Sequence, residues 1–104
     1  MIVHVTKYNI NTDKAEAFQN WVKVVIPQIL ATPGVTEFRG YRPVSGSWQV
    51  VTTVEFTDMN ALANFVASEA GNKMSDELHA LAFDVNYEIW GNSPVVPVAL
   101  HPAK

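Results

Sequence analysis

The sequence PGVTEFRGYR (residues 33–42), followed by PVSGS (43–47) and WQVVTTVEF (48–56), lies at the centre of this chain and is its clearest β signal. The two flanking runs are rich in Val, Thr, Phe, Tyr and Trp, which are residues that β-strands favour. The segment between them holds Pro, Ser and Gly, which favour turns. We therefore predict a β-hairpin whose strands are joined by the five-residue loop 43–47.

The segments before the hairpin predict one strand and one long helix. Residues 2–8 alternate, as a strand does, between two sets of side chains: Val3, Val5 and Lys7 against Ile2, His4, Thr6 and Tyr8. Asp13 and Glu16 have capping-box spacing, and apolar residues then recur at helical steps to about Leu30. Pro27 lies within this helix and predicts a kink or a break, because it removes a backbone hydrogen bond.

The segments after the hairpin predict two helices and a last strand. Helices are expected at about 59–68 and 73–82, with an interruption at 71–72, and the strand is expected at 84–90. The resulting order is that of a ferredoxin-like β-α-β-β-α-β unit. We therefore predict an α+β fold with a four-stranded antiparallel sheet, and a single domain over residues 1–104.

The strand predicted at 48–56 carries apolar residues on both faces. We expect one face to meet the helices and any pocket, through Trp48, Val50, Val54 and Phe56. We expect the other face, through Val51 and Thr53, to meet a second copy of the chain. A strand that is apolar on both sides needs a second covering layer, so a homodimer is predicted. The tail, 91–104, is apolar in part and is expected to pack on the partner subunit.

Composition narrows the classes of partner and of chemistry. Hydrophobic residues make up 48% of the chain and charged residues 16%, which fits a small domain that hides apolar surface in an oligomer. The net charge of −3 and the scattered Lys and Arg residues indicate no nucleic-acid partner, and no long apolar run indicates a membrane. The chain has no Cys, and its three His residues are far apart in sequence, so we expect no metal site. A cytoplasmic location is expected.

Parts of the chain resemble a known family. The resemblance rests on TPGV (32–35), YR (41–42), VEFTDMNAL (54–62), Phe65 and SE (68–69). These segments resemble the dimeric α+β barrel superfamily and, within it, the antibiotic biosynthesis monooxygenase-like domains. By the order of elements, the resemblance covers about residues 1–90. It implies a homodimer in which two sheets pack into a barrel with helices outside, and a ligand pocket between the sheet and the helices of each subunit.

The resemblance implies a cofactor-independent monooxygenase that acts on a small aromatic or polyketide-like compound. Two alternatives stay open: a non-catalytic barrel that binds small ligands or is associated with stress, and an isomerase of lactones or dienols. Haem degradation is disfavoured, because Phe65 stands where those relatives carry a Trp and because Asn9 and His79 are displaced from the matching positions. No Gly-rich phosphate loop is present, since the glycines are widely spaced.

Aromatic side chains supply the candidate binding residues. They come from the long helix, both hairpin strands, the later helices and the last strand, so several must meet in one space, either as plain core or as walls of a pocket for a flat apolar ligand. The predicted substrate-binding residues are Trp21, Phe65, Phe56, Arg39 and Trp48.

The predicted catalytic residues are His79, Tyr41 and Asn86. His79 is the candidate general base, because imidazole titrates near neutral pH, and its alternative reading is a boundary residue with one ring nitrogen in solvent. Tyr41 and Asn86 are candidate hydrogen-bond partners of a phenolate-type intermediate. No cofactor is expected.

Overall fold

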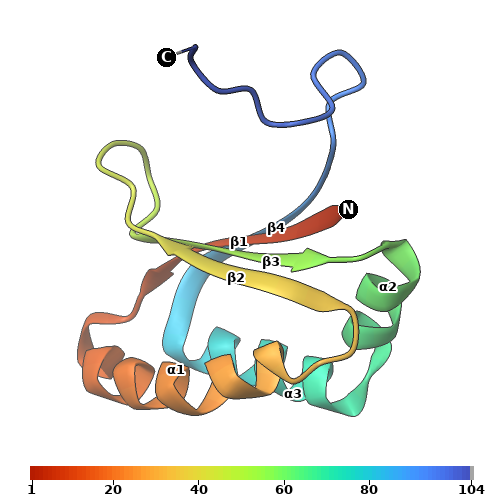
Figure 1. Cartoon of the computed structure of the whole chain (residues 1–104). Helices are drawn as coiled ribbons and strands as arrows, with labels where there is room; N and C mark the ends of the chain where they lie inside the picture. Colours follow the sequence, from red (N-terminus) through yellow and green to blue (C-terminus); the bar gives the residue numbers. More distant parts are fainter. Residues whose placement is uncertain (104) are drawn as a thin grey trace.

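The strand at the N-terminus, β1 (Ile2–Ile10), lies in the middle of a four-stranded antiparallel sheet with the order β2-β3-β1-β4 (Figure 1). The structure, a computed structural model, describes residues 1–103. The other elements are η1 (Thr12–Lys14), α1 (Ala15–Leu30), β2 (Val35–Tyr41), β3 (Val50–Phe56), α2 (Met59–Ala67), α3 (Glu69–Leu81) and β4 (Ala82–Gly91). The predicted ferredoxin-like α+β fold is confirmed.

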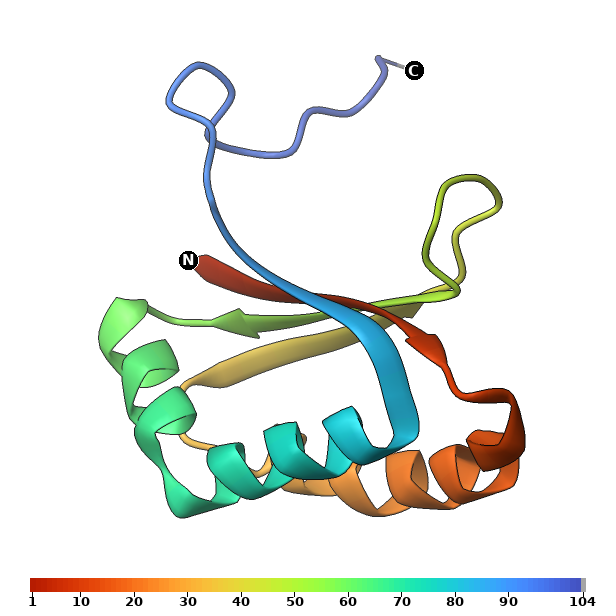
Figure 2. The ribbon, with the colours of Figure 1, turned by 180° about the vertical axis from the view of Figure 1, so that it is seen from behind.

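All three α-helices lie on one side of the sheet, which leaves the other side without helices (Figures 1 and 2). We call the helix side the inner face and the other side the outer face. Residues that pair across antiparallel strands point to the same face. The inner face therefore includes the pairs Ile2–Phe56, His4–Val54, Thr6–Thr52 and Tyr8–Val50, and the outer face includes Val5–Thr53 and Lys7–Val51.

The hairpin differs from the prediction in its connection. β2 ends at Tyr41 and β3 begins at Val50, so the loop is longer than the expected 43–47. Gln49 explains the late start of β3. Its backbone N–H donates to Asn9 Oδ1 at 2.8 Å, and its side-chain oxygen accepts from the Ile10 N–H at 2.8 Å. This reciprocal pair holds Gln49 against the end of β1, so the alternation of β3 does not extend back to Trp48.

Helix α1 runs through Pro27 without a break, so of the expected kink or break the break does not occur. Pro27 leaves the carbonyl of Lys23 without its helical donor, and both residues lie on the exposed side of the helix. Water can therefore satisfy that carbonyl. The helix ends before Gly34, whose φ of 87° is a conformation that glycine adopts without strain. The expected capping box at Asp13 and Glu16 forms no side-chain cap.

Helices α2 and α3 meet at Ser68, three residues before the expected break at Gly71. Asp58 caps α2 by accepting from the Ala61 N–H at 2.8 Å, and Ser68 Oγ caps α3 by accepting from the Gly71 N–H at 2.9 Å. Gly71 therefore lies in the first turn of α3. A Cβ atom at this position would stand 2.1 Å from the Phe65 carbonyl oxygen, so only glycine lets the two helices approach this closely.

The core divides into two clusters at opposite ends of the inner face. One contains Tyr8, Phe18, Leu78 and Ala82, and the other contains Val54, Phe56 and Leu62. The predicted placement of Val50, Val54 and Phe56 toward the helices is confirmed. Between the two clusters, the inner face carries the small, partly polar pair Thr6 and Thr52. The middle of the layer is therefore less filled than its ends.

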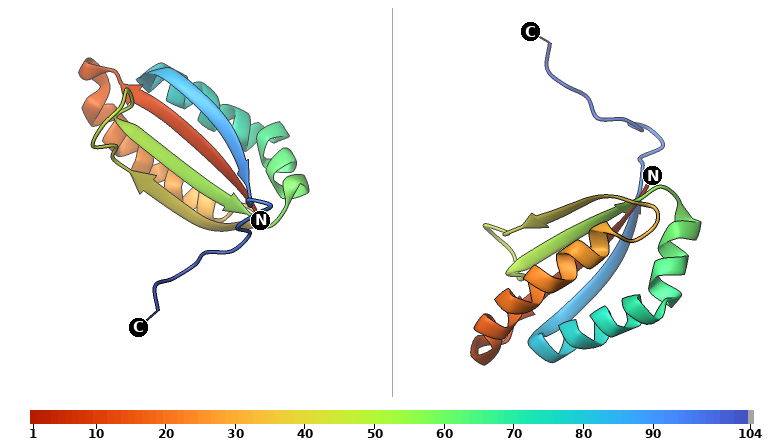
Figure 3. Two further views of the ribbon diagram at one scale, coloured as in Figure 1. Left: turned by 90° about the horizontal axis from the view of Figure 1, so that it is seen from above. Right: turned by 60° about the horizontal axis from the view of Figure 1, so that its bottom comes forward.

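No helix covers the outer face of the sheet (Figure 3), and several of its aromatic side chains are exposed. Tyr41, Phe83 and Trp90 expose 50%, 48% and 47% of their surfaces. Lys7 Nζ lies 3.1 Å from Glu88 Oε2 and over the rings of Trp48 and Trp90, at 5.3 and 5.9 Å from their centroids. Beyond Gly91 the tail runs away from the sheet on this same side (Figure 1), with Val95, Val98 and Leu100 exposed.

Candidate functional site

A cavity of about 110 Å³ lies between the two core clusters, and it is partly open to solvent. Its sheet side is lined by His4, Thr6, Tyr8, Phe38, Thr52, Val54 and Tyr87. Its helix side is lined by Trp21, Val22, Val25, Ile26, Ile29, Phe65, Gly71, Met74, Ser75 and Leu78. The cavity is thus apolar toward the helices and mixed toward the sheet, because β1 and β3 place His and Thr at its floor.

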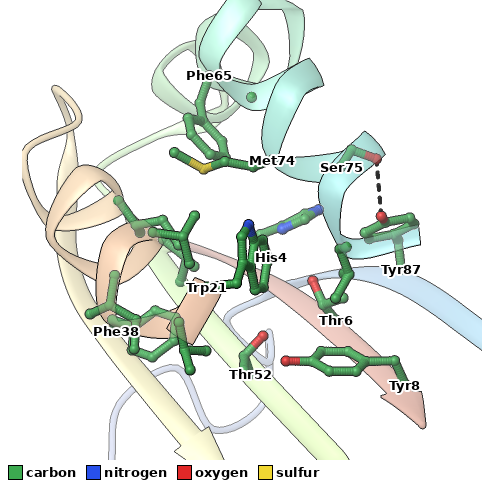
Figure 4. Close-up of a pocket in the computed structure, with 17 residues that line it drawn as sticks. His4, Thr6, Tyr8, Trp21, Phe38, Thr52, Phe65, Met74, Ser75 and Tyr87 are labelled. Atoms are coloured by element: carbon green, nitrogen blue, oxygen red, sulfur yellow. Dashed lines mark hydrogen bonds between the residues drawn. The ribbon is translucent and has the colours of Figure 1, made fainter. Parts of the chain in front are cut away.

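The polar groups of the floor come at two-residue steps on β1. His4, Thr6 and Tyr8 share the inner face because successive strand residues alternate between faces. Figure 4 shows these side chains rising from the sheet toward the helices, with Thr52 beside them. Within residues 1–103, the His4 ring and the Tyr8 hydroxyl have no hydrogen-bond partner. Among the same residues, every polar side-chain atom that is fully buried does have a partner, so these two groups are not fully buried. These two groups therefore open into the cavity.

Burial sets the protonation state of both groups. Removal of the His4 imidazole from water lowers its pKa below the ordinary value of 6.5, because the charged form loses its hydration. Burial raises the pKa of Tyr8 well above its ordinary value for the same reason. At neutral pH the cavity therefore presents a neutral imidazole, which can accept a proton, and a neutral phenol, which can donate a hydrogen bond.

Tyr87 of β4 fixes the His4 ring from one side. The two rings stack with centroids 5.7 Å apart and planes 23° apart. The Tyr87 hydroxyl is in turn 3.2 Å from Ser75 Oγ on α3, within hydrogen-bond distance (Figure 4). A side chain that is stacked on one strand and tied to a helix has few alternative rotamers. His4 is therefore held in a defined position at the floor.

Trp21 and Phe65, two of the predicted binding residues, line the cavity. The Trp21 ring packs beside Phe18, and its indole N–H donates to Glu77 Oε1 at 3.2 Å. This hydrogen bond orients the indole ring and gives its N–H group a partner, which a buried tryptophan needs. Phe65 packs against Phe56 with ring centroids 5.7 Å apart. Phe56 itself is fully buried behind Phe65 and does not reach the cavity.

His79, the candidate base, lies on α3 outside the cavity lining. It is exposed, and its Nδ1 is 2.7 Å from the Ser75 carbonyl oxygen, so this nitrogen carries the proton that it donates. Its ring centroid is 6.0 Å from that of Tyr87. Tyr87 therefore separates His79 from His4 and from the cavity.

The remaining predicted residues lie on the outer face. Arg39 and Tyr41 of β2 pair with Thr53 and Val51, and Asn86 of β4 pairs with Lys7. Trp48 lies on this face as well, under Lys7, and its indole N–H donates to the Asp84 carbonyl oxygen at 3.0 Å. The expected position of these four residues beside a ligand thus differs from their place in the structure, where the sheet separates them from the cavity.

The polar floor of the cavity lies outside what the sequence patterns predicted. The signal was present, because His4, Thr6 and Tyr8 form one of the two alternating sets of the first strand. Nothing in the alternation says which set faces the helices. Val3, Val5 and Lys7 read as an equally good inner set, apart from the single charge.

Comparison with models of known protein families assigns the chain to one family. Residues 1–76 match the model of the antibiotic biosynthesis monooxygenase family. The match covers well over half of the chain, so the protein belongs to this family. No curated protein matches the sequence significantly.

Solved structures share the fold at low sequence identity. SnoaB, a cofactor-independent oxygenase from Streptomyces nogalater, has a TM-score of 0.75 and 16% identity, over 93% of this chain and 97% of its own. The At3g17210 protein of Arabidopsis thaliana has a TM-score of 0.80 and 14% identity, over 96% of this chain and 100% of its own. A Nitrosomonas europaea protein that bears the same family name has a TM-score of 0.72 and 18% identity, over 88% and 98%. At these identities the likeness establishes the fold alone.

Two further properties concern the described residues, 1–103. None of their helices combines the length and the hydrophobicity that crossing a membrane requires. No three of their His, Asp or Glu side chains stand close enough together to hold a metal ion.

Proposed function

We propose that this protein is a cofactor-independent monooxygenase that acts on a small aromatic or polyketide-like compound in the cavity between sheet and helices. One observation carries the proposal. The cavity is walled by apolar side chains toward the helices, yet its floor holds an imidazole and a phenol that have no hydrogen-bond partner among residues 1–103. Membership of the antibiotic biosynthesis monooxygenase family supports it.

The chemistry follows from what a cofactor-free oxygenase needs. The substrate itself supplies the electrons, so the protein must remove a proton from it and stabilise the resulting anion. A neutral base and a neutral hydrogen-bond donor, both open to one space, meet those two needs. The apolar wall with Trp21 and Phe65 keeps water from the helix side of the anion, and oxygen, which is small and apolar, can enter there.

The test is oxygen uptake by the purified protein with an anthrone-type phenol and with single-ring phenols. The expected result is uptake that depends on substrate and needs no added metal or cofactor. Val25→Phe fills the cavity and should abolish it, because Val25 lines the cavity and is 3% exposed. Val24→Phe is the matched control on the neighbouring, 60% exposed position and should retain it.

Two results would contradict the proposal. Turnover of a lactone or dienol without oxygen uptake would make the protein an isomerase, and ligand binding without any turnover would make it a binding protein. Loss of activity in Val24→Phe as well as in Val25→Phe would show that the effect does not come from the cavity.

We also propose that the outer face pairs with a second copy of the chain. The support is the exposed aromatic surface of Tyr41, Phe83 and Trp90, together with an apolar tail on the same side of the sheet. Removing such apolar surface from water favours association. The tail residues Val95 and Leu100, 85% and 75% exposed, would pack on the partner subunit.

A further inference from the structure

The most distinctive group in the cavity is the His4 imidazole. It is the only basic side chain in the lining, which contains no Lys, Arg, Asp or Glu within the described residues. The other titratable groups that line the cavity are the phenols of Tyr8, on the same strand, and Tyr87, on β4. β3 and the helices contribute neutral side chains to the lining, and the Glu77 carboxylate stays outside it, bonded to the Trp21 indole.

We propose that His4 is the catalytic base of this protein, that Tyr87 positions it, and that its substrate is a single-ring phenol. The inference deepens the proposed function and rests on it. In the step assigned to His4, the O–H bond of the phenol breaks and the proton forms an N–H bond on the imidazole. The electron pair stays on the phenol oxygen, so the products are a phenolate and an imidazolium, and no other reactant is needed.

The volume of the cavity favours a substrate with a single ring. A cavity of about 150 Å³ suffices to bind benzene. The cavity of about 110 Å³ seen here is smaller, and it is partly open to solvent. Because the cavity is open on one side, a single ring can enter it with part of the ring and its remaining atoms at the mouth. A polycyclic compound is far larger than this space, so a single ring is the better match.

The polar groups of the lining favour a phenol over a hydrocarbon. A single-ring hydrocarbon would displace water from the His4 ring and the Tyr8 hydroxyl without giving either group a new partner, which is costly. A phenol that lies on the apolar wall and points its oxygen to the floor satisfies both groups. Its proton goes toward the imidazole, and the Tyr8 hydroxyl donates to the oxygen that becomes negative.

The resulting ion pair explains why His4 works without a carboxylate partner. The imidazolium and the phenolate form together and attract each other at short range, where few waters weaken the attraction. No other charge in the lining competes for either ion. The stack with Tyr87, whose hydroxyl is tied to Ser75, holds the imidazole in place for the transfer.

The experiment measures the ionisation of a bound phenol, which does not depend on oxygen chemistry. The probe is 4-nitrophenol, whose phenol and phenolate forms absorb at different wavelengths, and its non-ionisable analogue is 4-nitroanisole. The expected result is that wild-type protein raises the phenolate fraction of bound probe above that of free probe at the same pH. His4→Gln should lower the bound phenolate-to-phenol ratio by about tenfold, which corresponds to about one pKa unit. Its affinity for 4-nitroanisole should stay within about threefold.

Matched variants separate the roles of the residues. His101→Gln changes an exposed histidine of the tail and should behave as wild type. Tyr87→Phe keeps the ring that stacks on His4 and should retain most of the effect, whereas Tyr87→Leu removes the stack and should lose it. A purely structural role of Tyr87 would instead weaken 4-nitroanisole binding equally in both variants.

A measurement on the wild-type protein covers the case in which His4→Gln does not fold. The imidazole of His4 is followed by NMR as pH is varied, with and without 4-nitrophenol. The pKa of His4 should rise when the probe binds, because the phenolate stabilises the imidazolium. An unchanged titration of His4 would overturn the inference.

Other outcomes are equally decisive. An unchanged ionised fraction in His4→Gln, a loss in His79→Gln instead, or the absence of any binding of either probe to wild-type protein would overturn the assignment of His4 and its substrate. Ionisation of bound phenol without oxygen uptake would overturn only the proposed monooxygenase. Oxygen uptake that is unaffected in His4→Gln would overturn only the role of His4.

Discussion

Thr6 of β1 and Thr52 of β3 are direct partners on the inner face of the sheet, and the cavity lies over them. On either side of this pair, the larger partners Tyr8–Val50 and His4–Val54 belong to or border the two core clusters. Close packing leaves few voids in a protein of this size. The short side chains of the two threonines therefore account for the position of the cavity at the centre of the layer.

Replacing one of these threonines by a larger residue should stabilise the fold and weaken ligand binding. Thr52→Ile adds apolar volume at the cavity floor without changing the β-branched shape that suits a strand. We expect the free energy of unfolding to rise by about 1 kcal/mol. Phenol binding should fall at least tenfold, as measured by calorimetry. Thr53→Ile, one residue along on the outer face, is the control and should leave binding intact. Equal loss of binding in both variants would contradict the assignment of the cavity.

The buried imidazole should make stability depend on pH. The pKa of His4 is lowered in the folded state by burial, so the unfolded chain binds a proton at a higher pH than the folded chain. The contribution of neutral His4 to stability is therefore complete above its ordinary pKa of 6.5 and is lost as pH falls through the lower, folded-state pKa. Urea unfolding at a series of pH values should show this loss in wild-type protein. His4→Gln should remove that part of the pH dependence, and an identical profile for the two proteins would argue against it.

Activity should follow the same titration. If neutral His4 is the base, kcat/KM falls as pH drops through the pKa of the free enzyme, which lies below 6.5. The pH profile of oxygen uptake with a single-ring phenol checks this. An acidic limb that persists unchanged in His4→Gln would assign the titration to another group.

The close approach of α2 and α3 should make Gly71 sensitive to substitution. Gly71→Ala places a Cβ atom 2.1 Å from the Phe65 carbonyl oxygen, so the helices must separate or distort. Overpacking of this kind costs about 1–3 kcal/mol. Gly40→Ala in β2 is the matched control, because a Cβ atom there meets nothing within 4 Å. Chemical denaturation should show a clear loss for the first variant and little change for the second, and equal effects would refute the close contact.

The outer face should govern association. Trp90→Arg places a charge where the partner sheet would lie, and light scattering at micromolar concentration should then report a monomer in place of a dimer. Leu30→Arg changes a residue of similar exposure on α1, 54% against 47%, and should not affect the dimer. A wild-type monomer at this concentration would contradict the proposed pairing of outer faces. Removal of residues 92–104 should weaken the dimer if the tail packs on the partner subunit.

Local patterns predicted most of the fold. The alternation in residues 2–8 and 48–56 and the helical spacing before Leu30 found the strands and α1, because each pattern follows from the geometry of one element. Predictions were wrong where the conformation of a residue depends on contact between two elements. Gly71 looked like an interruption, yet it permits contact with Phe65, and Trp48 looked like a strand residue, yet Gln49 is held by Asn9.

The predicted site shows the same division. Trp21 and Phe65 were placed in the cavity because apolar residues of helix stripes face the sheet in any packing of this fold. Tyr41, Arg39 and Asn86 were misplaced because the side that a strand residue faces depends on register. A shift by one residue moves a side chain to the opposite face.

The order of the elements, the ferredoxin-like topology and the membership of the antibiotic biosynthesis monooxygenase family all follow from the amino-acid sequence alone. These depend on local propensity and on periodicity along the chain. The folded chain is needed to see that His4, Thr6 and Tyr8 face the helices, and that Tyr87 stacks on His4 from 83 residues away. The physical reason is that the pairing of β1 with β3 and β4 sets the face of every side chain at once, and no segment carries that information alone.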